Sequence, residues 1–393
     1  MRKPLSLCLA LTLFCAALTG CTFHSGSTFH SGSTFHSGST SAASTSAAST
    51  SAAPTPDGPT LRLGVYLPQD DPVAEAVYAG AEYALLQRPS IQLDGVTYSV
   101  ELYWPSADDD ASLAKTLADA NCAAILGGLD YDACAAAAGT FREASLPMLS
   151  LAAEDGKMTR KNDFFFSFAP SVQREGRELA NWALEQKLTR GAVIDCITDP
   201  YTADVAAEFT RWLERKGKVV ATEVVTPDQA DFTEVLKAIK KADAQVVCAP
   251  LGLEQGIALL NQAGTLGLDV QWVSGSRWSQ DELVRQTGVN CEGVVLPSAY
   301  PLGRDEAFET WANTNLPSQS SWTWAAMGHD CCDFLLDAIQ QAGPQDGSAI
   351  AQALQRVSRT DGLCDTSTVD LRGGVGWNSL GRITVKKGAF QLM

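Results

Sequence analysis

The sequence predicts an α/β protein of two lobes, each a mostly parallel sheet flanked by helices. From Leu61 onward, short apolar runs alternate with stretches in which apolar residues recur at helical spacing. Strands that are apolar almost throughout are typical of parallel sheets covered by helices. Roughly 330 residues exceed what one hydrophobic core usually holds, so we expect two lobes. Two such sheets facing one another form a cleft at the carboxyl ends of their strands, where we expect the functional site.

The expected strands are short apolar segments, and most of them precede a helical pattern. We predict strands at residues 61–67, 100–104, 123–126, 148–151, 192–197, 219–225, 246–249, 270–273 and 294–296. The first helix should span residues 72–86, because Asp71 is a good N-cap and Pro72 suits the first helical position.

Two later segments show the apolar spacing of helices that cover a sheet with one face. Val205, Phe209, Trp212 and Leu213 lie at i, i+4, i+7 and i+8. The segment 232–239 repeats this pattern with Phe232, Val235, Leu236 and Ile239 at i, i+3, i+4 and i+7. Both helices should therefore lie against the same sheet as their neighbouring strands.

The first twenty residues have the layout of an export signal. Arg2 and Lys3 precede an apolar run, and small residues lead to Cys21. Leu18-Thr19-Gly20-Cys21 resembles the bacterial lipobox, in which cleavage occurs before a lipidated cysteine. We therefore expect residues 1–20 to be removed and Cys21 to anchor the chain to the bacterial cell membrane by acyl chains. The alternative is an ordinary secretory signal that ends near a cysteine by chance.

Residues 21–60 have the composition of a flexible linker. Three copies of Thr-Phe-His-Ser-Gly-Ser begin at Thr22, Thr28 and Thr34, and Ser/Ala/Thr repeats and prolines follow. Such a segment cannot bury a core, and its root-mean-square reach is on the order of 35 Å. Its three histidines, His24, His30 and His36, have no fixed geometry for a metal ion.

Charge and histidine content exclude several classes of function. Removal of Arg2 and Lys3 with the signal takes the formal net charge from −16 to about −18. Such a chain repels nucleic acid, which we exclude as a partner. Only His329 remains outside the linker, which argues against a catalytic triad and a multi-histidine metal site. We expect no enzyme activity, no cofactor and no metal.

Eight cysteines remain after the signal peptide and Cys21 are set aside from the eleven in the chain. Cys196 and Cys248 lie in apolar strand-like segments, where a free thiol acts as a small core residue. The alternative for the others is a disulfide from Cys331 or Cys332 to Cys364, which export permits.

Segments along the mature chain resemble the type I extracytoplasmic solute-binding proteins, specifically the leucine/isoleucine/valine-binding branch that serves ABC importers. No single segment is specific, but their order and spacing match this family from residue 61 to residue 393. The segments are 63–68 (LGVYLP), 123–128 (AAILGG), 146–150 (LPMLS), 166–171 (FSFAPS), 199–201 (DPY), 231–232 (DF), 292–294 (EGV), 325–330 (AAMGHD) and the closing hairpin 373–390.

This resemblance implies the type I periplasmic-binding-protein fold, in which two hinged lobes close over a solute. It places lobe 1 at residues 61–171 with 300–365 and lobe 2 at residues 172–299 with 366–393. The implied function is capture of a small polar solute, an amino acid or amino-acid-like compound, by a monomer that delivers it to an ABC permease. The alternative is a ligand-sensing lobe for a membrane receptor.

The resemblance also implies a site in which the first lobe takes the ligand carboxylate, and a tyrosine and an acid of the second lobe take its ammonium. Where the family has serine and threonine after the fourth and fifth strands, this chain has Asp130 and Glu154. The acid's place in lobe 2 falls near Ser276 and Arg277, whereas Tyr201 fits the tyrosine loop. The other candidates for ligand contact are Tyr131, Ser150 and Ala152.

Two acids on the first lobe change what the site can bind. Each would repel a carboxylate at 4 Å by about 4 kcal/mol at an effective dielectric of 20. Three interpretations remain: a neutral or cationic ligand at Asp130 and Glu154, a reversed amino acid whose carboxylate meets Arg277, or a site that has drifted. In a fourth interpretation, the two acids cap the helices that follow them.

Overall fold

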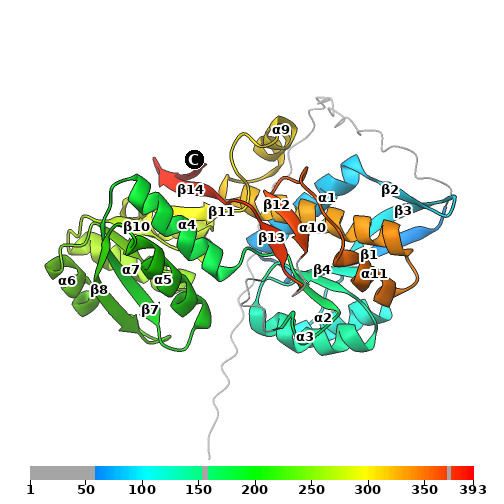
Figure 1. Ribbon diagram of the computed structural model, residues 1–393, viewed down its shortest axis with the longest axis horizontal. Helices are drawn as coiled ribbons and strands as arrows, with labels where there is room; N and C mark the ends of the chain where they lie inside the picture. The colour runs from blue at the N-terminus through cyan, green and yellow to red at the C-terminus, as the bar shows by residue number, and fades with distance from the viewer. Residues whose placement is uncertain (1–57, 153–157, 370–372) are drawn as a thin grey trace, which may run out of the picture. The chain divides into compact units, whose positions relative to one another are not determined.

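The structure, a computed structural model, describes residues 58–152, 158–369 and 373–393. The predicted export signal, Cys21, nearly all of the linker and Glu154 lie outside these ranges. Figure 1 shows two groups of elements, one mainly blue, cyan and orange and the other mainly green and yellow, and each group contains a sheet. The predicted α/β fold with two mostly parallel, helix-flanked sheets is confirmed.

The first sheet has six strands in the order β2-β3-β1-β4-β5-β6, and all neighbours are parallel except β2 and β3. Its central strands are buried on both faces, as the apolar runs predicted; Leu63 and Val65, for example, are fully buried. The strands are β1 (Thr60–Tyr66), β2 (Ser90–Leu93), β3 (Val96–Tyr103), β4 (Ala124–Gly127), β5 (Met148–Ser150) and β6 (Phe165–Ser167).

The helices that accompany this sheet include α1, whose N-terminus matches the prediction. Asp71 Oδ1 accepts hydrogen bonds from Val73 N at 2.7 Å and Ala74 N at 3.0 Å, and Pro72 is the first helical residue. Such a cap contributes about 1 kcal/mol. The helices are α1 (Pro72–Gln87), α2 (Asp110–Asp119), α3 (Tyr131–Glu143), α9 (Glu306–Asn315), α10 (Ser320–Ala342) and α11 (Gly347–Leu354).

Helices α1 and α10 approach one another closely because both carry glycine at the crossing. A Cβ atom on Gly80 would lie 1.8 Å from Ala325 O, and one on Gly328 would lie 2.0 Å from Val77 O. Only glycine fits at these two positions. The close packing buries most of α10 and holds it in place as it passes the candidate site.

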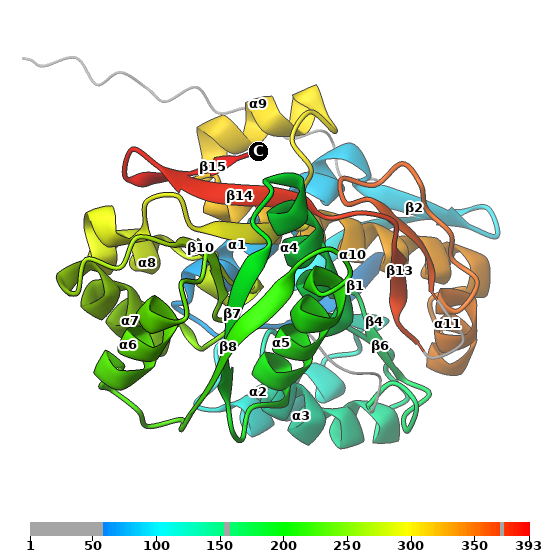
Figure 2. The same cartoon turned by 60° about the vertical axis from the view of Figure 1, so that its left-hand side comes forward.

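The second sheet has seven strands in the order β15-β14-β11-β10-β9-β7-β8. Figure 2 shows β14 and β15, in red, at one edge of this sheet and β8 at the other. Strands β7 to β11 are parallel to one another. Strand β14 pairs with β11 in the antiparallel sense, and β15 pairs with β14 in the same way. They are β7 (Arg190–Cys196), β8 (Lys218–Val225), β9 (Val246–Cys248), β10 (Gln271–Val273), β11 (Val295–Ser298), β14 (Gly381–Lys386) and β15 (Ala389–Leu392).

The two helices predicted from apolar spacing lie against this sheet as expected. Val205, Phe209 and Leu213 are buried on one helix, and Leu236 and Ile239 on the other. The helical elements here are α4 (Val172–Glu185), α5 (Pro200–Leu213), α6 (Thr233–Lys241), α7 (Leu253–Thr265), η1 (Ser276–Trp278), α8 (Asp281–Thr287) and η2 (Gly288–Cys291).

A separate antiparallel pair, β12 (Thr366–Val369) and β13 (Val375–Trp377), lies between α11 and β14 in sequence. It contacts the end of the first sheet, because Gly374 bridges to Ser167 and Trp377 Nε1 donates to Phe168 O at 3.0 Å. The sequence pattern predicted neither this pair nor the short strands β2 and β6. The lobe boundaries stay predictions, as do the three hinge crossings that these boundaries imply near Ser171, Tyr300 and Thr366.

The cysteines outside the signal and Cys21 are free and buried. The predicted core packing of Cys196 and Cys248 is confirmed, whereas the alternative disulfide to Cys364 is not formed. Burial raises the pKa of these thiols, as for Cys134, whose pKa is about 12. Within the described ranges, no helix has the length and apolar content needed to cross a membrane.

Candidate solute-binding site

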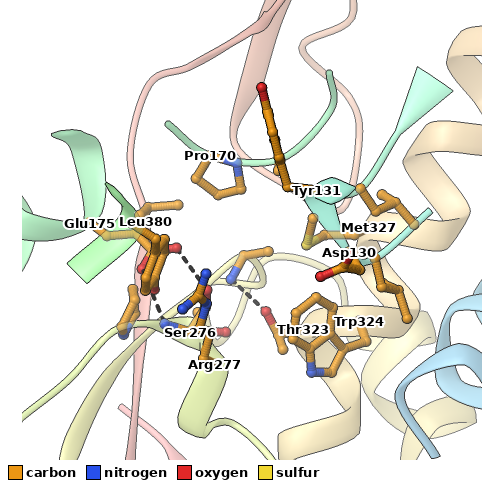
Figure 3. A pocket seen from close by; sticks show the side chains of 17 residues that line it. Asp130, Tyr131, Pro170, Glu175, Ser276, Arg277, Thr323, Trp324, Met327 and Leu380 are labelled. Atoms are coloured by element: carbon orange, nitrogen blue, oxygen red, sulfur yellow. Dashed lines mark hydrogen bonds between the residues drawn. The ribbon is translucent and has the colours of Figure 1, made fainter. Parts of the chain in front are cut away.

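A cavity of about 290 Å³ is lined by residues of elements from both sheets. The loop between β4 and α3 contributes Leu129, Asp130 and Tyr131 on one side. The opposite side consists of residues from the start of α4, the start of α5 and η1. Helix α10 forms a third side of the cavity. Figure 3 shows the labelled side chains arranged around this hollow. A concave site of this size, with apolar walls and a few polar groups, is typical of small-molecule sites.

Asp130 lies on the side of the cavity formed by the β4–α3 loop and also caps a helix. It is the N-cap of α3, and its Oδ1 accepts a hydrogen bond from Ala133 N at 2.9 Å. A carboxylate is favoured at this position by the exposed N–H groups of the first helical turn. The capping interpretation is therefore realised for Asp130, at a place where its side chain also lines the cavity.

The apolar part of the cavity comes from α10. Trp324 and Met327, one helical turn apart, both line it. Trp324 is held by a hydrogen bond from its Nε1 to Ser279 O at 3.2 Å, next to η1. In Figure 3, Trp324, Met327 and Asp130 lie together on the side of the hollow opposite Glu175 and Ser276.

On the other side, Glu175 joins three segments that are distant in sequence. Its Oε2 accepts from Tyr201 Oη at 2.6 Å and from Ser276 N at 3.1 Å. Its Oε1 accepts from Ser276 Oγ at 2.7 Å. The residue is 1% exposed. Helices α4 and α5 and the turn η1 are thus linked at one carboxyl group on the wall of the cavity.

Burial raises the pKa of the Glu175 carboxyl, because the charged form loses solvation. The hydrogen bonds from Tyr201 and Ser276 and the charge of Arg277 act in the opposite direction but do not cancel this effect. The pKa of Tyr201 is raised as well, by burial and then by the neighbouring Glu175 charge. Tyr201 therefore stays a neutral hydrogen-bond donor at physiological pH.

Arg277 is fixed by two contacts with residues around the start of α5. Its guanidinium lies 4.0 Å from the centre of the Tyr201 ring, a cation–π geometry. Its NH1 pairs with Asp199 Oδ2 at 2.5 Å, while Asp199 Oδ1 accepts from Tyr201 N at 3.0 Å. The side chain is partly exposed and lines the cavity. Its remaining N–H groups provide an anchor for an anionic group of a ligand.

Gly275, immediately before η1, is required by this arrangement. A Cβ atom there would lie 1.9 Å from Tyr201 Oη and 2.9 Å from Glu175 Oε2. No side chain fits without separating the tyrosine from the carboxyl group. The absence of a side chain at Gly275 thus allows η1 to lie this close to α4 and α5.

A second cavity, of about 490 Å³, adjoins the first and is lined in part by the same residues: Asp130, Tyr131, Tyr201 and Arg277. It adds the carboxylates of Asp132, Asp199 and Asp204. We call the first the inner cavity and the second the outer cavity. In both, Arg277 is the one basic side chain among the lining residues that the structure describes.

Five of the predicted site residues line the inner cavity: Asp130, Tyr131, Tyr201, Ser276 and Arg277. Their role in ligand contact stays a prediction. Ser150 and Ala152 are buried and are not among the described residues that line either cavity. The Ser150 hydroxyl accepts from Ala152 N at 3.1 Å, so both belong to the end of β5 behind the wall.

Glu175, Trp324 and Met327 are among the lining residues that the sequence reasoning missed. Glu175 carried a usable signal, because it falls among Val172, Gly176 and Leu179 on the buried face of α4. A charged residue on such a face needs partners and therefore indicates a site. Trp324 and Met327 gave no such signal, because an apolar pair at helical spacing is equally typical of a hydrophobic core.

The chain belongs to the periplasmic binding protein family, whose model matches residues 97–388. Members bind small solutes outside the cytoplasm and work with ABC permeases, and they are binding proteins and not enzymes. No curated protein matches the chain.

Solved structures of such proteins share the fold. The leucine-binding protein LivK from Thermotoga maritima is 20% identical, with a TM-score of 0.71; the match covers 85% of this chain and 98% of that one. LivJ from Streptococcus pneumoniae, in complex with isoleucine, is 18% identical with a TM-score of 0.69, over 85% and 99% of the chains. A solute-binding protein from R. palustris, in complex with 4-hydroxybenzoate, is 16% identical with a TM-score of 0.70, over 85% and 95%.

Proposed function

We propose that the protein captures a small polar solute, an amino acid or an amino-acid-like compound, by lobe closure and delivers it to an ABC permease. One observation carries the proposal. Asp130 and Arg277, an acid from the first lobe and a base from the second, line the same cavity together with the apolar side chains of α10. A compound with both charged ends and an apolar body is complementary to this lining.

Contact with both lobes is what couples binding to closure. A ligand shifts an open–closed equilibrium only by the difference in its affinity for the two states. A solute that touches α10 and the β4–α3 loop on one side, and η1 on the other, has its full set of contacts only when these elements are close. This is the hinge-closure mode of transition.

The solved structures with bound ligands are compatible with this size of solute. Two of the proteins described above are complexes, one with isoleucine and the other with 4-hydroxybenzoate. Both ligands are small molecules with a carboxylate. We infer that this protein binds a solute of similar size. The charge of that solute is derived from the residues that line the cavity of this protein.

We further propose that the protein is a monomer anchored to the membrane. Residues 1–20 would serve as the signal, the Cys21 thiol would carry the lipid, and residues 22–60 would form the linker. Cys21→Ala should move the protein from the membrane fraction to the soluble fraction, which fractionation and immunoblotting would detect. Retention of the variant in the membrane fraction would contradict lipid anchoring at this residue.

Solute binding is tested by differential scanning fluorimetry against amino acids, short peptides, amides, polyamines and aromatic acids. A ligand at about 100 times its dissociation constant stabilises the protein by about 2.7 kcal/mol. Met327→Trp should abolish the shift, because it fills the apolar side of the cavity. Leu86→Trp, at a 73% exposed position of α1, is the matched control and should keep it.

Two outcomes would contradict the proposal. One is the absence of a thermal shift with every compound class. The other is a shift that survives in Met327→Trp, because the solute would then bind elsewhere on the protein. The melting temperature of each variant without solute shows whether the substitution itself disturbs the fold.

A further inference from the structure

We propose that the solute is a basic amino acid, with its carboxylate bound by Arg277 and its cationic nitrogens facing Asp130 and the outer cavity. The inference rests on the proposed function and names the substrate class of the same site. It reverses the polarity that the family resemblance implies, in which the first lobe takes the carboxylate.

The charge balance of the two cavities carries the argument. The described lining residues include one guanidinium, that of Arg277, and a larger set of carboxyl groups. These acids are Asp130, Asp132, Glu175, Asp199 and Asp204. Carboxylates that lose water without a compensating cation are costly. Closure over a neutral or anionic solute would leave this excess of negative charge unbalanced.

Two of these acids are already compensated within the protein. Glu175 accepts three hydrogen bonds, from Tyr201 Oη and from Ser276 N and Oγ. Asp199 pairs with Arg277 and caps α5. These two serve the internal arrangement of the wall that faces Asp130, and the role of binding a cationic group falls to Asp130.

Asp130 is the acid of the inner cavity that is exposed and can be reached by a cationic group of the solute. Its Oδ1 accepts from Ala133 N, and no lysine or arginine of the described residues forms a salt bridge with it. Figure 3 shows its carboxylate directed into the hollow, across from Arg277. An ammonium placed between them would contact a carboxylate that belongs to both cavities.

Arg277 accounts for the anionic end of the solute. The Tyr201 ring and Asp199 fix its guanidinium plane, and its other N–H groups match a carboxylate in geometry. The aliphatic stem of a basic amino acid suits the apolar side chains of Trp324 and Met327. A solute with one carboxylate, two cationic groups and an apolar stem therefore satisfies each part of the lining.

Isothermal titration calorimetry on the purified protein tests the inference with five probes. These are lysine, arginine, Nε-acetyl-lysine, leucine and the diamine putrescine. Lysine or arginine should bind at least tenfold more tightly than leucine and Nε-acetyl-lysine, which lack the second cation. Putrescine should bind more weakly than lysine, because it has no carboxylate for Arg277. The affinity for lysine should fall as ionic strength rises.

Variants assign the two ends of the solute. Asp130→Asn keeps a good N-cap but removes the charge, so it should weaken lysine binding at least tenfold. Asp109→Asn is the matched control, because Asp109 caps α2 through Ser112 N at 2.7 Å and lines neither cavity. Arg277→Gln should weaken lysine binding and leave putrescine binding nearly unchanged.

The outcomes separate this inference from the proposed function. Tighter binding of leucine than of lysine, or equal lysine affinity in Asp130→Asn, overturns the basic-amino-acid assignment and leaves solute capture intact. Tighter binding of putrescine than of lysine overturns the role of Arg277 as the carboxylate anchor. If none of the probes and none of the compounds in the fluorimetry panel binds, the proposed function itself fails.

Discussion

Glu175 shows how one buried side chain organises a wall of the site. Its hydrogen bonds connect α4, α5 and η1, and the Tyr201 ring that it holds lies against Arg277. The residue therefore acts on the cavity through its neighbours as well as by lining it. Buried polar groups of this kind stabilise one arrangement when all their partners are present.

The raised pKa of Glu175 predicts a pH dependence of stability. A carboxyl group whose pKa is higher in the folded state stabilises the protein fully only below its unfolded pKa, near 4.5. This contribution is lost as pH rises through the folded pKa. The wild-type free energy of unfolding should therefore fall as pH increases above about 4.5, and Glu175→Gln should lack this component. Urea denaturation between pH 5 and 8 measures both proteins.

The control for this measurement is Glu254→Gln, an exposed glutamate in the first turn of α7. It should follow the wild-type pH dependence. The prediction fails if Glu175→Gln keeps the wild-type profile, because another group would then be responsible for it.

The close packing around Gly275 predicts that a larger residue at this position would reduce both stability and solute binding. Gly275→Ala places a methyl group at the Tyr201–Glu175 hydrogen bond and should destabilise the protein by about 1–3 kcal/mol. It should also weaken solute binding at least tenfold, because η1 carries Arg277. Gly139→Ala, at a helical position of α3 with open space around it, should instead stabilise by about 0.5–1 kcal/mol. Unchanged binding in Gly275→Ala would argue against the close approach.

At the scale of an element, α10 connects the site to the core. Its N-terminal part contacts α8 and the residue after η1, since Ser320 Oγ donates to Asp281 Oδ1 at 2.7 Å and Trp324 donates to Ser279 O. Farther along, it packs against α1 through the two glycines described above. The same helix therefore presents Trp324 and Met327 to the cavity and holds them against a rigid support.

Asp330 ties α10 to the segment before β12. Its carboxylate accepts from Leu363 N at 2.9 Å, Cys364 N at 2.8 Å and His329 Nδ1 at 2.8 Å, and it is fully buried. Asp330→Ala leaves buried N–H groups without acceptors and should destabilise the protein by roughly 3 kcal/mol in urea denaturation.

Asp346→Ala is the comparison for this change, because Asp346 accepts from two backbone N–H groups as the N-cap of α11 in an exposed setting. It should cost about 1 kcal/mol. An equal decrease in the free energy of unfolding in the two variants would show that burial does not strengthen the contribution of the Asp330 hydrogen bonds.

At the scale of the whole molecule, the position of the cavity predicts that binding and closure are coupled. A saturating solute should decrease the radius of gyration measured by small-angle X-ray scattering. At 100 times the dissociation constant, it should also raise the free energy of unfolding by about 2.7 kcal/mol. Met327→Trp with the same excess of solute is the control and should show neither change. Stabilisation at a constant radius of gyration would mean that the solute enters a site already formed.

The amino-acid sequence by itself determined the fold class, because strand and helix periodicities are local. The apolar runs around Leu63 and Val193 and the cap at Asp71 needed no knowledge of the rest of the chain. The resemblance to solute-binding proteins, and not the local pattern, indicated Asp130, Tyr201 and Arg277 as candidate site residues.

Only the tertiary structure decided which side chains meet. Glu175 and Ser276 are 101 positions apart, and no local pattern predicts their hydrogen bonds or the raised pKa that burial produces. The pairing of Arg277 with Asp199 and the placement of α10 against the cavity depend on the same folding of distant segments together. Site chemistry depends on distances between such segments, whereas secondary structure depends mainly on neighbours along the chain.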